Sequence, residues 1–88
     1  MAKYSILTDR ELTRLLRSGD HQAFGELYHR YWETLLNTAY KRLDSIEEAE
    51  EILQDLFITL YVNRNSLQIN TTLEGYLKTS LKHRVLNL

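Results

Sequence analysis

The amino-acid sequence predicts an all-α fold, a compact bundle of four helices in which a short first helix packs on a three-helix core. Apolar residues recur at the i, i+3, i+4 spacing of amphipathic helices along most of the chain. Ser, Thr or Asp stands just before these periodic segments, where a helix N-cap is expected. No segment shows the apolar-polar alternation of a strand. With 88 residues, the chain has room for one domain.

The first helix is expected from about Asp9 to Ser18. Thr8 and Glu11 stand in the register of a capping box, in which each side chain satisfies the backbone amide of the other residue. Gly19 follows the segment, at a place where many helices end in a left-handed residue. The single leucine stripe of this segment predicts a short helix that packs across the rest of the bundle.

The second helix is expected to begin after Asp20 as N-cap and to continue to Leu43. Leucine and aromatic residues recur along it at helical spacing, so it is the longest element of the predicted bundle. Aromatic residues in such a stripe could stack on nucleic-acid bases, but they more commonly belong to the core. We therefore expect this stripe to form core.

The third helix is expected to start at a second capping box, Ser45 and Glu48, and it has two different faces. The apolar residues of its inner face are Ala49, Ile52, Leu53, Leu56, Phe57 and Leu60. Its outer face carries Glu47, Glu51, Gln54, Asp55, Ile58 and Val62. Acids suit the first turn because the N-terminal end of a helix carries partial positive charge. Exposed β-branched apolar residues, in contrast, do not suit a surface that contacts only water. We interpret the outer face as a contact surface for another protein.

A loop is expected over residues 63–71, because Asn and Ser are frequent there and the apolar period is lost. Leu67 and Ile69 would hold this loop on the bundle. It is either a plain surface connection or a polar pocket that binds the edge of an unstacked base. The last helix is expected to start at a capping box formed by Thr71 and Glu74.

Leucines give the last helix its inner side, with Ser80 and Arg84 near them: Leu73, Leu77, Leu81 and Leu88. Lys78 and Lys82 are i, i+4 neighbours on its outer side. Two such lysines either keep the surface solvated or bind phosphates.

Charge is distributed unevenly, although the net charge is only −1. Residues 44–55 hold six acids and no basic residue, whereas residues 56–88 hold four basic residues and one acid. A contact with nucleic acid is therefore expected in the last third of the chain.

Several classes of function have no support in the sequence. There is no Cys, no glycine-rich phosphate loop and no His-Glu-x-x-His motif, and the three His do not have metal-ligand spacing. We expect no catalytic residue, no metal and no cofactor. No apolar run approaches the ~20 residues of a membrane span, and the lack of Cys fits a reducing compartment, so a cytoplasmic protein without membrane insertion is expected.

Three segments carry a family resemblance. Residues 51–57 (EILQDLF) resemble the acidic-aliphatic-x-Gln-acidic segment of bacterial sigma factors, in the extracytoplasmic-function group. Residues 23–28 (AFGELY) are similar to the opening of that group's second conserved region, and residues 73–77 (LEGYL), followed by His83 and Arg84, are similar to its closing helix. The resemblance covers residues 8–88 in the right order. It implies that residues 1–88 form a sigma factor region 2 domain.

This resemblance implies a transcription initiation factor, not an enzyme, that binds the clamp coiled coil of the largest subunit of core RNA polymerase. It also implies recognition and melting of the minus-ten promoter element, with one base held out of the duplex. On this sequence, the resemblance assigns polymerase binding to Gln54 first, together with Glu51, Asp55 and Ile58. DNA binding falls to Asn63, Arg64, Asn65 and Ser66 in the loop, and to Tyr76, Lys78, Thr79, Lys82 and His83 on the last helix.

Further expectations concern the whole protein. The family has a second, helix-turn-helix domain called region 4, which nothing in this sequence matches, so we expect the chain to be the N-terminal part of a longer protein. An anti-sigma factor is an expected partner. The alternative from another class is a helical protein-interaction module without DNA binding, which would use the same outer face but give Lys78 and Lys82 no role.

Overall fold

The computed structural model describes residues 2–69 and 71–87, and they contain helices and no strand. The elements are α1 (Ala2–Ser5), α2 (Asp9–Arg17), α3 (His21–Leu43), α4 (Ile46–Val62), the short 3-10 helix η1 (Arg64–Ser66) and α5 (Leu73–Leu86). The all-α prediction is confirmed, and the four expected helices correspond to α2, α3, α4 and α5. Two elements differ from the prediction: α1 was not expected, and η1 lies in a segment predicted as loop.

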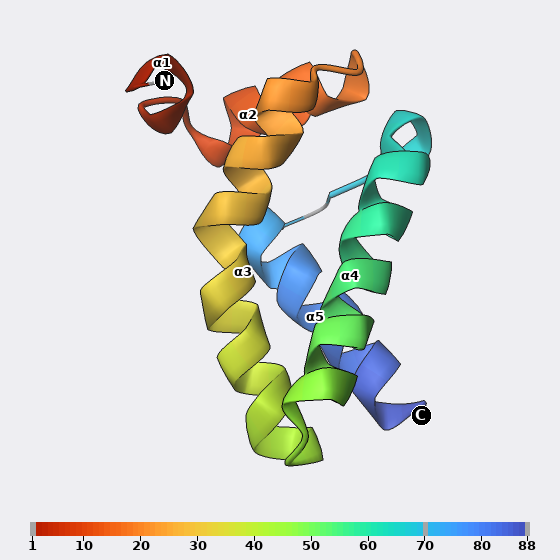
Figure 1. Cartoon of the computed structure of the whole chain (residues 1–88). Helices are drawn as coiled ribbons and strands as arrows, with labels where there is room; N and C mark the ends of the chain where they lie inside the picture. Colours follow the sequence, from red (N-terminus) through yellow and green to blue (C-terminus); the bar gives the residue numbers. More distant parts are fainter. Residues whose placement is uncertain (1, 70, 88) are drawn as a thin grey trace.

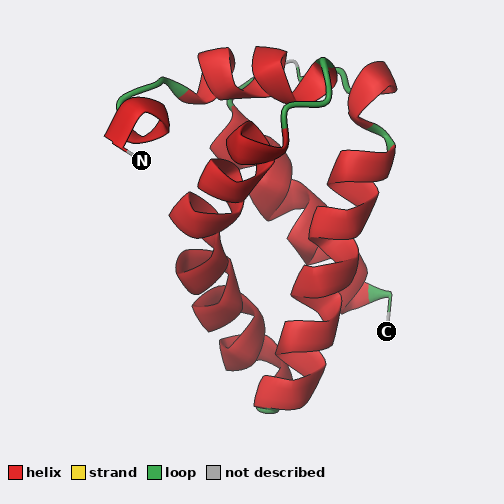
Figure 2. Ribbon diagram, turned by 45° about the horizontal axis from the view of Figure 1, so that its top comes forward, coloured by secondary structure: helices red, strands yellow, loops and turns green. Residues whose placement is uncertain are grey.

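Helix α3 is the centre of the bundle, because it contacts α1, α2, α4 and α5. α3 and α4 run side by side in opposite directions, and α5 packs against both (Figure 1). Figure 2 shows α2 lying across one end of this three-helix core. The expected arrangement, a short helix packed on a three-helix core, is therefore confirmed.

The starts of α2 and α3 are built as the sequence predicts. The Glu11 amide donates to Thr8 Oγ1 at 3.1 Å, and the Thr8 amide donates to Glu11 Oε1 at 2.8 Å, which completes the capping box. Gly19 has a φ of +89°, in the left-handed region that a residue with a side chain rarely adopts. Asp20 caps α3 by accepting hydrogen bonds from the two backbone amides that follow His21. These contacts fix the sharp turn between α2 and α3.

The start of α5 differs from the prediction by one residue. Its N-cap is Thr72, not Thr71, and the Thr72 hydroxyl accepts a hydrogen bond from the Gly75 amide at 3.0 Å. Glu74 does not reach back to a cap but forms an ion pair with Lys78 at 2.9 Å. The shift follows from geometry, because a cap must stand directly before the first helical residue and that residue is the buried Leu73.

The second expected capping box is present in part. Ser45 accepts a hydrogen bond from the Glu48 amide at 3.2 Å, which is one half of the pair of bonds. The residue before it, Asp44, has a φ of +55° and ends α3 in a left-handed conformation that the sequence reading did not foresee. Asp is one of the residue types that tolerates this region. The two residues together reverse the chain between α3 and α4.

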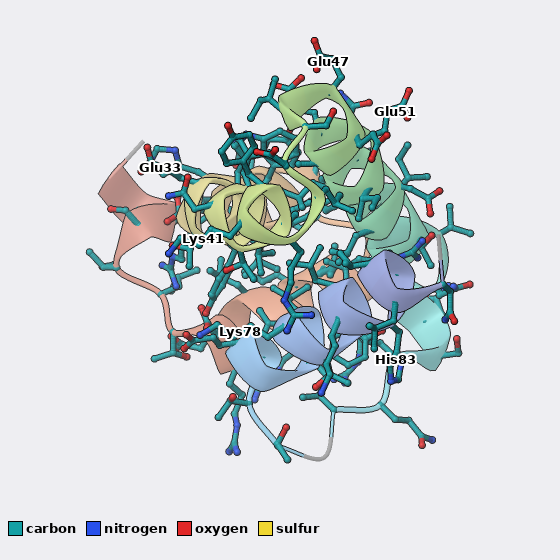
Figure 3. All side chains as sticks on the ribbon, turned by 90° about the horizontal axis from the view of Figure 1, so that it is seen from below. Glu33, Lys41, Glu47, Glu51, Lys78 and His83 are labelled. Carbon is teal, nitrogen blue, oxygen red and sulfur yellow. The ribbon has the colours of Figure 1, made fainter. Side chains whose placement is uncertain are left out.

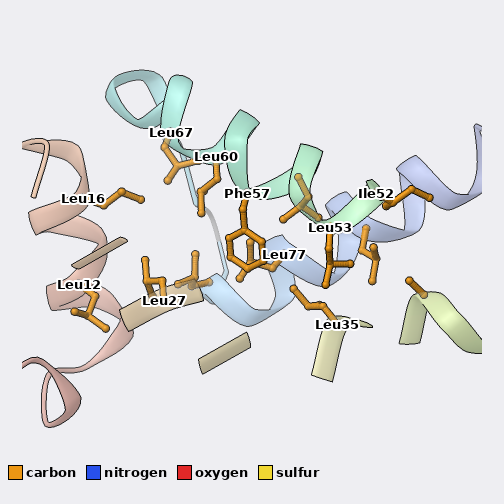
Figure 4. Packing of buried hydrophobic residues seen from close by; sticks show 14 of the residues in the cluster. Leu12, Leu16, Leu27, Leu35, Ile52, Leu53, Phe57, Leu60, Leu67 and Leu77 are labelled. Atoms are coloured by element: carbon orange, nitrogen blue, oxygen red, sulfur yellow. The ribbon is translucent and has the colours of Figure 1, made fainter. Parts of the chain in front are cut away.

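The core confirms the expected inner faces of α4 and α5, whereas the aromatic stripe of α3 is only half-buried and Tyr28 is exposed. All six residues of the α4 inner face are buried, and so are Leu73, Leu77 and Leu81 of α5, whereas Leu88 lies outside the described residues. Phe57 is the largest fully buried side chain, and it lies among leucines of several elements (Figure 4). Leu67, in the expected loop, is also buried. Since α4 buries one whole face, its other face must be turned outward.

The N-terminal segment is fastened to α3 by Arg30. Its guanidinium donates to Glu26 at 2.8 Å, to Asp9 at 3.0 Å and to the Leu7 carbonyl at 2.6 Å. The Tyr31 hydroxyl donates to the second oxygen of Asp9. Burial first, and then this carboxylate, raise the pKa of Tyr31 far above its usual range. This polar network holds α1 and the start of α2 against the centre of the bundle.

Candidate functional site

The outer face of α4 is exposed, as the sequence predicts. Glu51, Gln54, Asp55 and Ile58, which the resemblance assigned to polymerase binding, all lie on this exposed surface. The amide of Gln54 is thus offered to solvent, with carboxylates one residue after it and three residues before it. Figure 3 shows the acidic start of the helix, at Glu47 and Glu51, projecting away from the bundle. The exposure is confirmed, and the role of these residues stays a prediction.

Two apolar side chains stand on the same face. Ile58 is 60% exposed and Val62 is 66% exposed, at adjacent turns of α4. Exposed aliphatic residues bordered by carboxylates form the usual anatomy of a protein interface, in which an apolar centre has a charged rim. This arrangement suits a partner that is cationic and partly apolar.

Asp55 is not only exposed but also paired. Its Oδ2 accepts a hydrogen bond from Nη1 of Arg84, which joins α4 to α5. Both residues line a groove of about 380 Å³ together with Glu51, Ile52, His83 and Asn87. The groove therefore brings residues expected to bind polymerase next to His83, which is expected to bind DNA. The sequence predicts Arg84 near the inner side of the helix, and this ion pair was not predicted.

The expected DNA residues of the loop do not form one uniform surface. Asn63, Asn65 and Ser66 are exposed, but Arg64 is half-buried. The Arg64 guanidinium lies 4.2 Å from the centre of the Tyr61 ring, and its Nη1 donates to the Tyr61 carbonyl at 2.9 Å. A cation held over an aromatic ring and bonded to a carbonyl already has a structural role. Arg64 thus shapes the loop, and its DNA contact stays a prediction.

On α5, the expected DNA residues lie mostly on the outside. Lys78, Thr79, Lys82 and His83 are exposed, whereas Tyr76 is half-buried and packs on the core. Lys78 and His83 project from successive parts of the helix (Figure 3). Because Lys78 is engaged with Glu74, less positive charge is available here than the sequence suggests.

A basic groove that the sequence reading missed lies between α2 and the chain that leads into α5. Its volume is about 570 Å³, and its lining includes Arg10, Arg14 and Arg17 together with Ile69 and Leu73. One acid, Asp9, also lines it and is paired with Arg30. Four threonines also border it: Thr8, Thr13, Thr71 and Thr72. The signal was present in the sequence, because positions 10, 14 and 17 share one face of a helix. These arginines lie outside the last third of the chain, where the charge distribution predicts the nucleic-acid contact.

The arginines of this basic groove differ in their contacts. Arg17 donates to the Leu67 carbonyl at 3.0 Å and so ties the loop to α2. Within residues 2–69 and 71–87, no hydrogen bond engages the guanidinium of Arg10 or Arg14, and Arg14 is attracted electrostatically by Glu11 without a close ion pair. These two cations are available to an anionic ligand that enters the groove.

Other chemistry finds little support in the described residues. They contain no group of three or more His, Cys, Asp or Glu side chains that could hold a metal ion. The clear pKa shifts belong to side chains near the N-terminal half of the bundle, such as Asp20 and Tyr31, where hydrogen bonds and burial that serve the fold explain them. In the part of the chain that the structure describes, no helix is both long and apolar enough to cross a membrane.

Comparisons with known proteins agree with this geometry. Residues 27–88 match the family described as Sigma-70 region 2. Over 62 residues the chain is 34% identical to the extracytoplasmic-function RNA polymerase sigma factor SigW of Bacillus subtilis (strain 168), a match that covers 70% of this chain and 33% of that protein. The fold is similar, with a TM-score of 0.80 and 26% identity, to an engineered region 2 of sigmaE solved by NMR in complex with GTAAAA. That match covers 92% of this chain and 84% of the other.

Proposed function

The chain belongs to the Sigma-70 region 2 family, in its extracytoplasmic-function group, and we propose that it binds core RNA polymerase and the minus-ten element of promoters. The resemblance stated for the sequence is confirmed by the family match and by the two relatives. The chain spans about a third of the length of SigW, so the activity and partners of a whole sigma factor are part of the proposal. The single observation that carries the proposal is Gln54, exposed between carboxylates on the outer face of α4.

For polymerase binding, we assign Glu51, Gln54, Asp55 and Ile58 to the contact with the clamp coiled coil of the largest subunit. The acids of α4 attract a basic partner from a distance and increase the association rate. The exposed apolar side chain of Ile58 supplies surface that is removed from water on docking. An exposed amide in the middle of this face can donate and accept hydrogen bonds, so it can select for a partner of complementary shape.

For DNA binding, we assign the exposed loop residues Asn63, Asn65 and Ser66 and the outer residues of α5, with the basic groove beside them. The engineered region 2 of sigmaE was solved in complex with GTAAAA, and it shares the fold over nearly the whole chain. A positively charged groove that follows a phosphate backbone is a common design for binding single strands. Arg10 and Arg14, at a groove that also borders the loop, fit this design.

The other residues that the resemblance assigned to DNA keep their proposed roles. Tyr76, Thr79, Lys82 and His83 lie on α5, the helix that follows the loop, and can contact bases or phosphates. Lys78 and Arg64 must exchange Glu74 and Tyr61, respectively, for DNA. We therefore expect Lys82 to contribute more to DNA affinity than Lys78.

A protein-interaction module without DNA binding is the second candidate. The observation that favours it is the engagement of Lys78 and Arg64 by groups of the chain itself. It would use the same outer face of α4 for its partner. It differs from the first proposal in giving Lys82 and the basic groove no ligand.

Binding of a labelled single-stranded oligonucleotide containing GTAAAA, followed by fluorescence anisotropy with and without core polymerase, separates the two candidates. We expect Lys82→Glu to weaken binding about tenfold, since it replaces a phosphate contact by a repulsion of similar size. Lys41→Glu, the same change at an exposed position of α3, is the matched control and should have a much smaller effect. Equal effects of the two changes, or no binding by the unaltered chain with polymerase present, would favour the protein-interaction module.

The setting of this function is also proposed. We expect a non-catalytic role in the cytoplasm, without membrane insertion, and control by an anti-sigma factor that covers one of the exposed surfaces. A second, helix-turn-helix domain elsewhere in a longer protein stays a prediction.

A further inference from the structure

One ion pair joins the two surfaces to which the proposed function assigns different partners. Arg84 of α5 donates to Asp55 of α4, where Asp55 is assigned to polymerase and the neighbour of Arg84, His83, is assigned to DNA. The side chain of Asp55 is 64% exposed and that of Arg84 is 28% exposed. The pair thus lies at the surface, where both partners would arrive.

The surroundings of the pair divide by charge. Along the groove of about 380 Å³, the carboxylates of Glu51 and Asp55 come from α4, whereas the guanidinium of Arg84 comes from α5. An exposed ion pair contributes little to the stability of the fold, because water solvates both charges when they separate. The Asp55–Arg84 pair can therefore open without loss of the bundle.

We propose that Asp55 holds Arg84 in reserve, and that docking of a cationic polymerase surface on Asp55 releases the Arg84 guanidinium to bind a DNA phosphate. This inference rests on the proposed function. A cation arriving at Asp55 competes for the same carboxylate and also repels Arg84. Arg84 lies on the helix assigned to DNA, where a phosphate can replace the lost carboxylate as its partner.

The release must be reciprocal. If occupation of Asp55 makes Arg84 available for DNA, then occupation of Arg84 makes Asp55 available for polymerase, by the same factor. In the isolated chain the Asp55–Arg84 pair is formed, so DNA affinity should be lower than it would be with the Arg84 guanidinium free. Each partner should raise the affinity for the other.

The first experiment measures binding of the same labelled oligonucleotide to the isolated chain. Asp55→Asn should raise affinity about threefold, because the pair no longer holds Arg84 in a closed state. Glu50→Gln is the matched control, since Glu50 is an exposed acid on α4 outside the groove, and it should change affinity much less. The gain should vanish in the double variant Asp55→Asn/Arg84→Gln. Equal effects of Asp55→Asn and Glu50→Gln would overturn the proposal, because the gain would then reflect net charge alone.

The second experiment titrates the chain with core polymerase in the absence of DNA. Arg84→Gln should bind polymerase about twofold more tightly than the unaltered chain, because Asp55 loses its internal competitor. Unchanged or weaker binding would overturn the inference. Thermal unfolding of each variant verifies that the bundle is intact, and Arg84→Lys provides a second variant that keeps the charge.

The two levels of proposal fail in different ways. If the unaltered chain binds neither the oligonucleotide nor polymerase, the proposed function is wrong and the inference falls with it. If the unaltered chain binds both, but neither variant shifts the affinity beyond its control, only the reserve role of Arg84 is wrong.

Discussion

Charged residues are arranged differently in two regions of this bundle, the one around α1 and the start of α2 and the one around α4 and α5. Around α1 and the start of α2, Arg30 engages two carboxylates and backbone carbonyls at once, and Asp9 is shared between Arg30 and Tyr31. These side chains are mostly shielded from water. The network orders a segment that buries few apolar side chains of its own.

Around α4 and α5, by contrast, charged residues meet in single exposed pairs, namely Asp55 with Arg84 and Glu74 with Lys78. Such pairs are screened by water and salt and are readily exchanged. The difference indicates that charges in the N-terminal network serve the fold, whereas charges on α4 and α5 remain available to partners. Stability measurements can test this division.

The largest effect on stability is expected from Arg30→Met. The change keeps an unbranched apolar stem but removes the guanidinium that donates to Asp9, Glu26 and the Leu7 carbonyl, so the free energy of unfolding should fall by about 2–3 kcal/mol. Urea denaturation followed by circular dichroism measures it. Arg42→Met, at an exposed position of the same helix, should change the free energy by less than about 0.5 kcal/mol. If the two variants lose the same stability, the N-terminal network has no special role.

An intermediate effect on stability is expected when the pH is lowered. The hydroxyl of Tyr4 donates to Asp20 at 2.7 Å, and this bond, with the N-cap bonds to two backbone amides, lowers the pKa of Asp20 from its usual 3.8. A carboxyl whose pKa is lower in the folded state stabilises the fold above its unfolded pKa, and this contribution is lost as the pH falls through the folded value. The midpoint of thermal unfolding should therefore decrease below about pH 4.

Asp20→Asn is the variant that checks this assignment. It retains an acceptor for the N-cap bonds but does not titrate, so its midpoint should be lower near neutral pH and should depend less steeply on pH in acid. A pH dependence identical to that of the unaltered chain would show that other carboxyls account for the loss.

The smallest effect is expected from Glu74→Gln. Because Glu74 and Lys78 are both more than half exposed, removing their attraction should change the free energy of unfolding by less than about 0.5 kcal/mol. The same change frees Lys78, so DNA affinity should rise modestly when measured by anisotropy. A loss of stability comparable to that of Arg30→Met would contradict the division between the two regions.

The helices and their caps could be predicted from the sequence because they depend on residues that are close together in the chain. The caps at Thr8 and Asp20 and the two faces of α4 depend on residues within a few positions of one another, and spacing alone reveals them. The same reasoning placed Gln54 outside. The misplaced cap of α5 shows its limit, since Thr71 and Thr72 are both suitable and only the burial of Leu73 decides between them.

Parts of the candidate site could not be predicted, because they depend on contacts between distant segments. The Asp55–Arg84 pair joins residues 29 positions apart, and Arg17 reaches the Leu67 carbonyl across 50 positions. The family resemblance assigned Arg64 to DNA, yet its position over the Tyr61 ring depends on how the chain turns after α4. Only an arrangement in space shows which cations are already engaged.

Leu67 is the buried anchor of the chain between η1 and α5, and Arg17 holds its carbonyl. The side chains on either side of it, Ser66 and Gln68, are exposed and make no contribution to the core. Exchanging these neighbours therefore alters what the loop presents while its attachment stays the same. Under the DNA contact proposed for this loop, new sequence preferences can evolve here without any compensating change in the helices that support it.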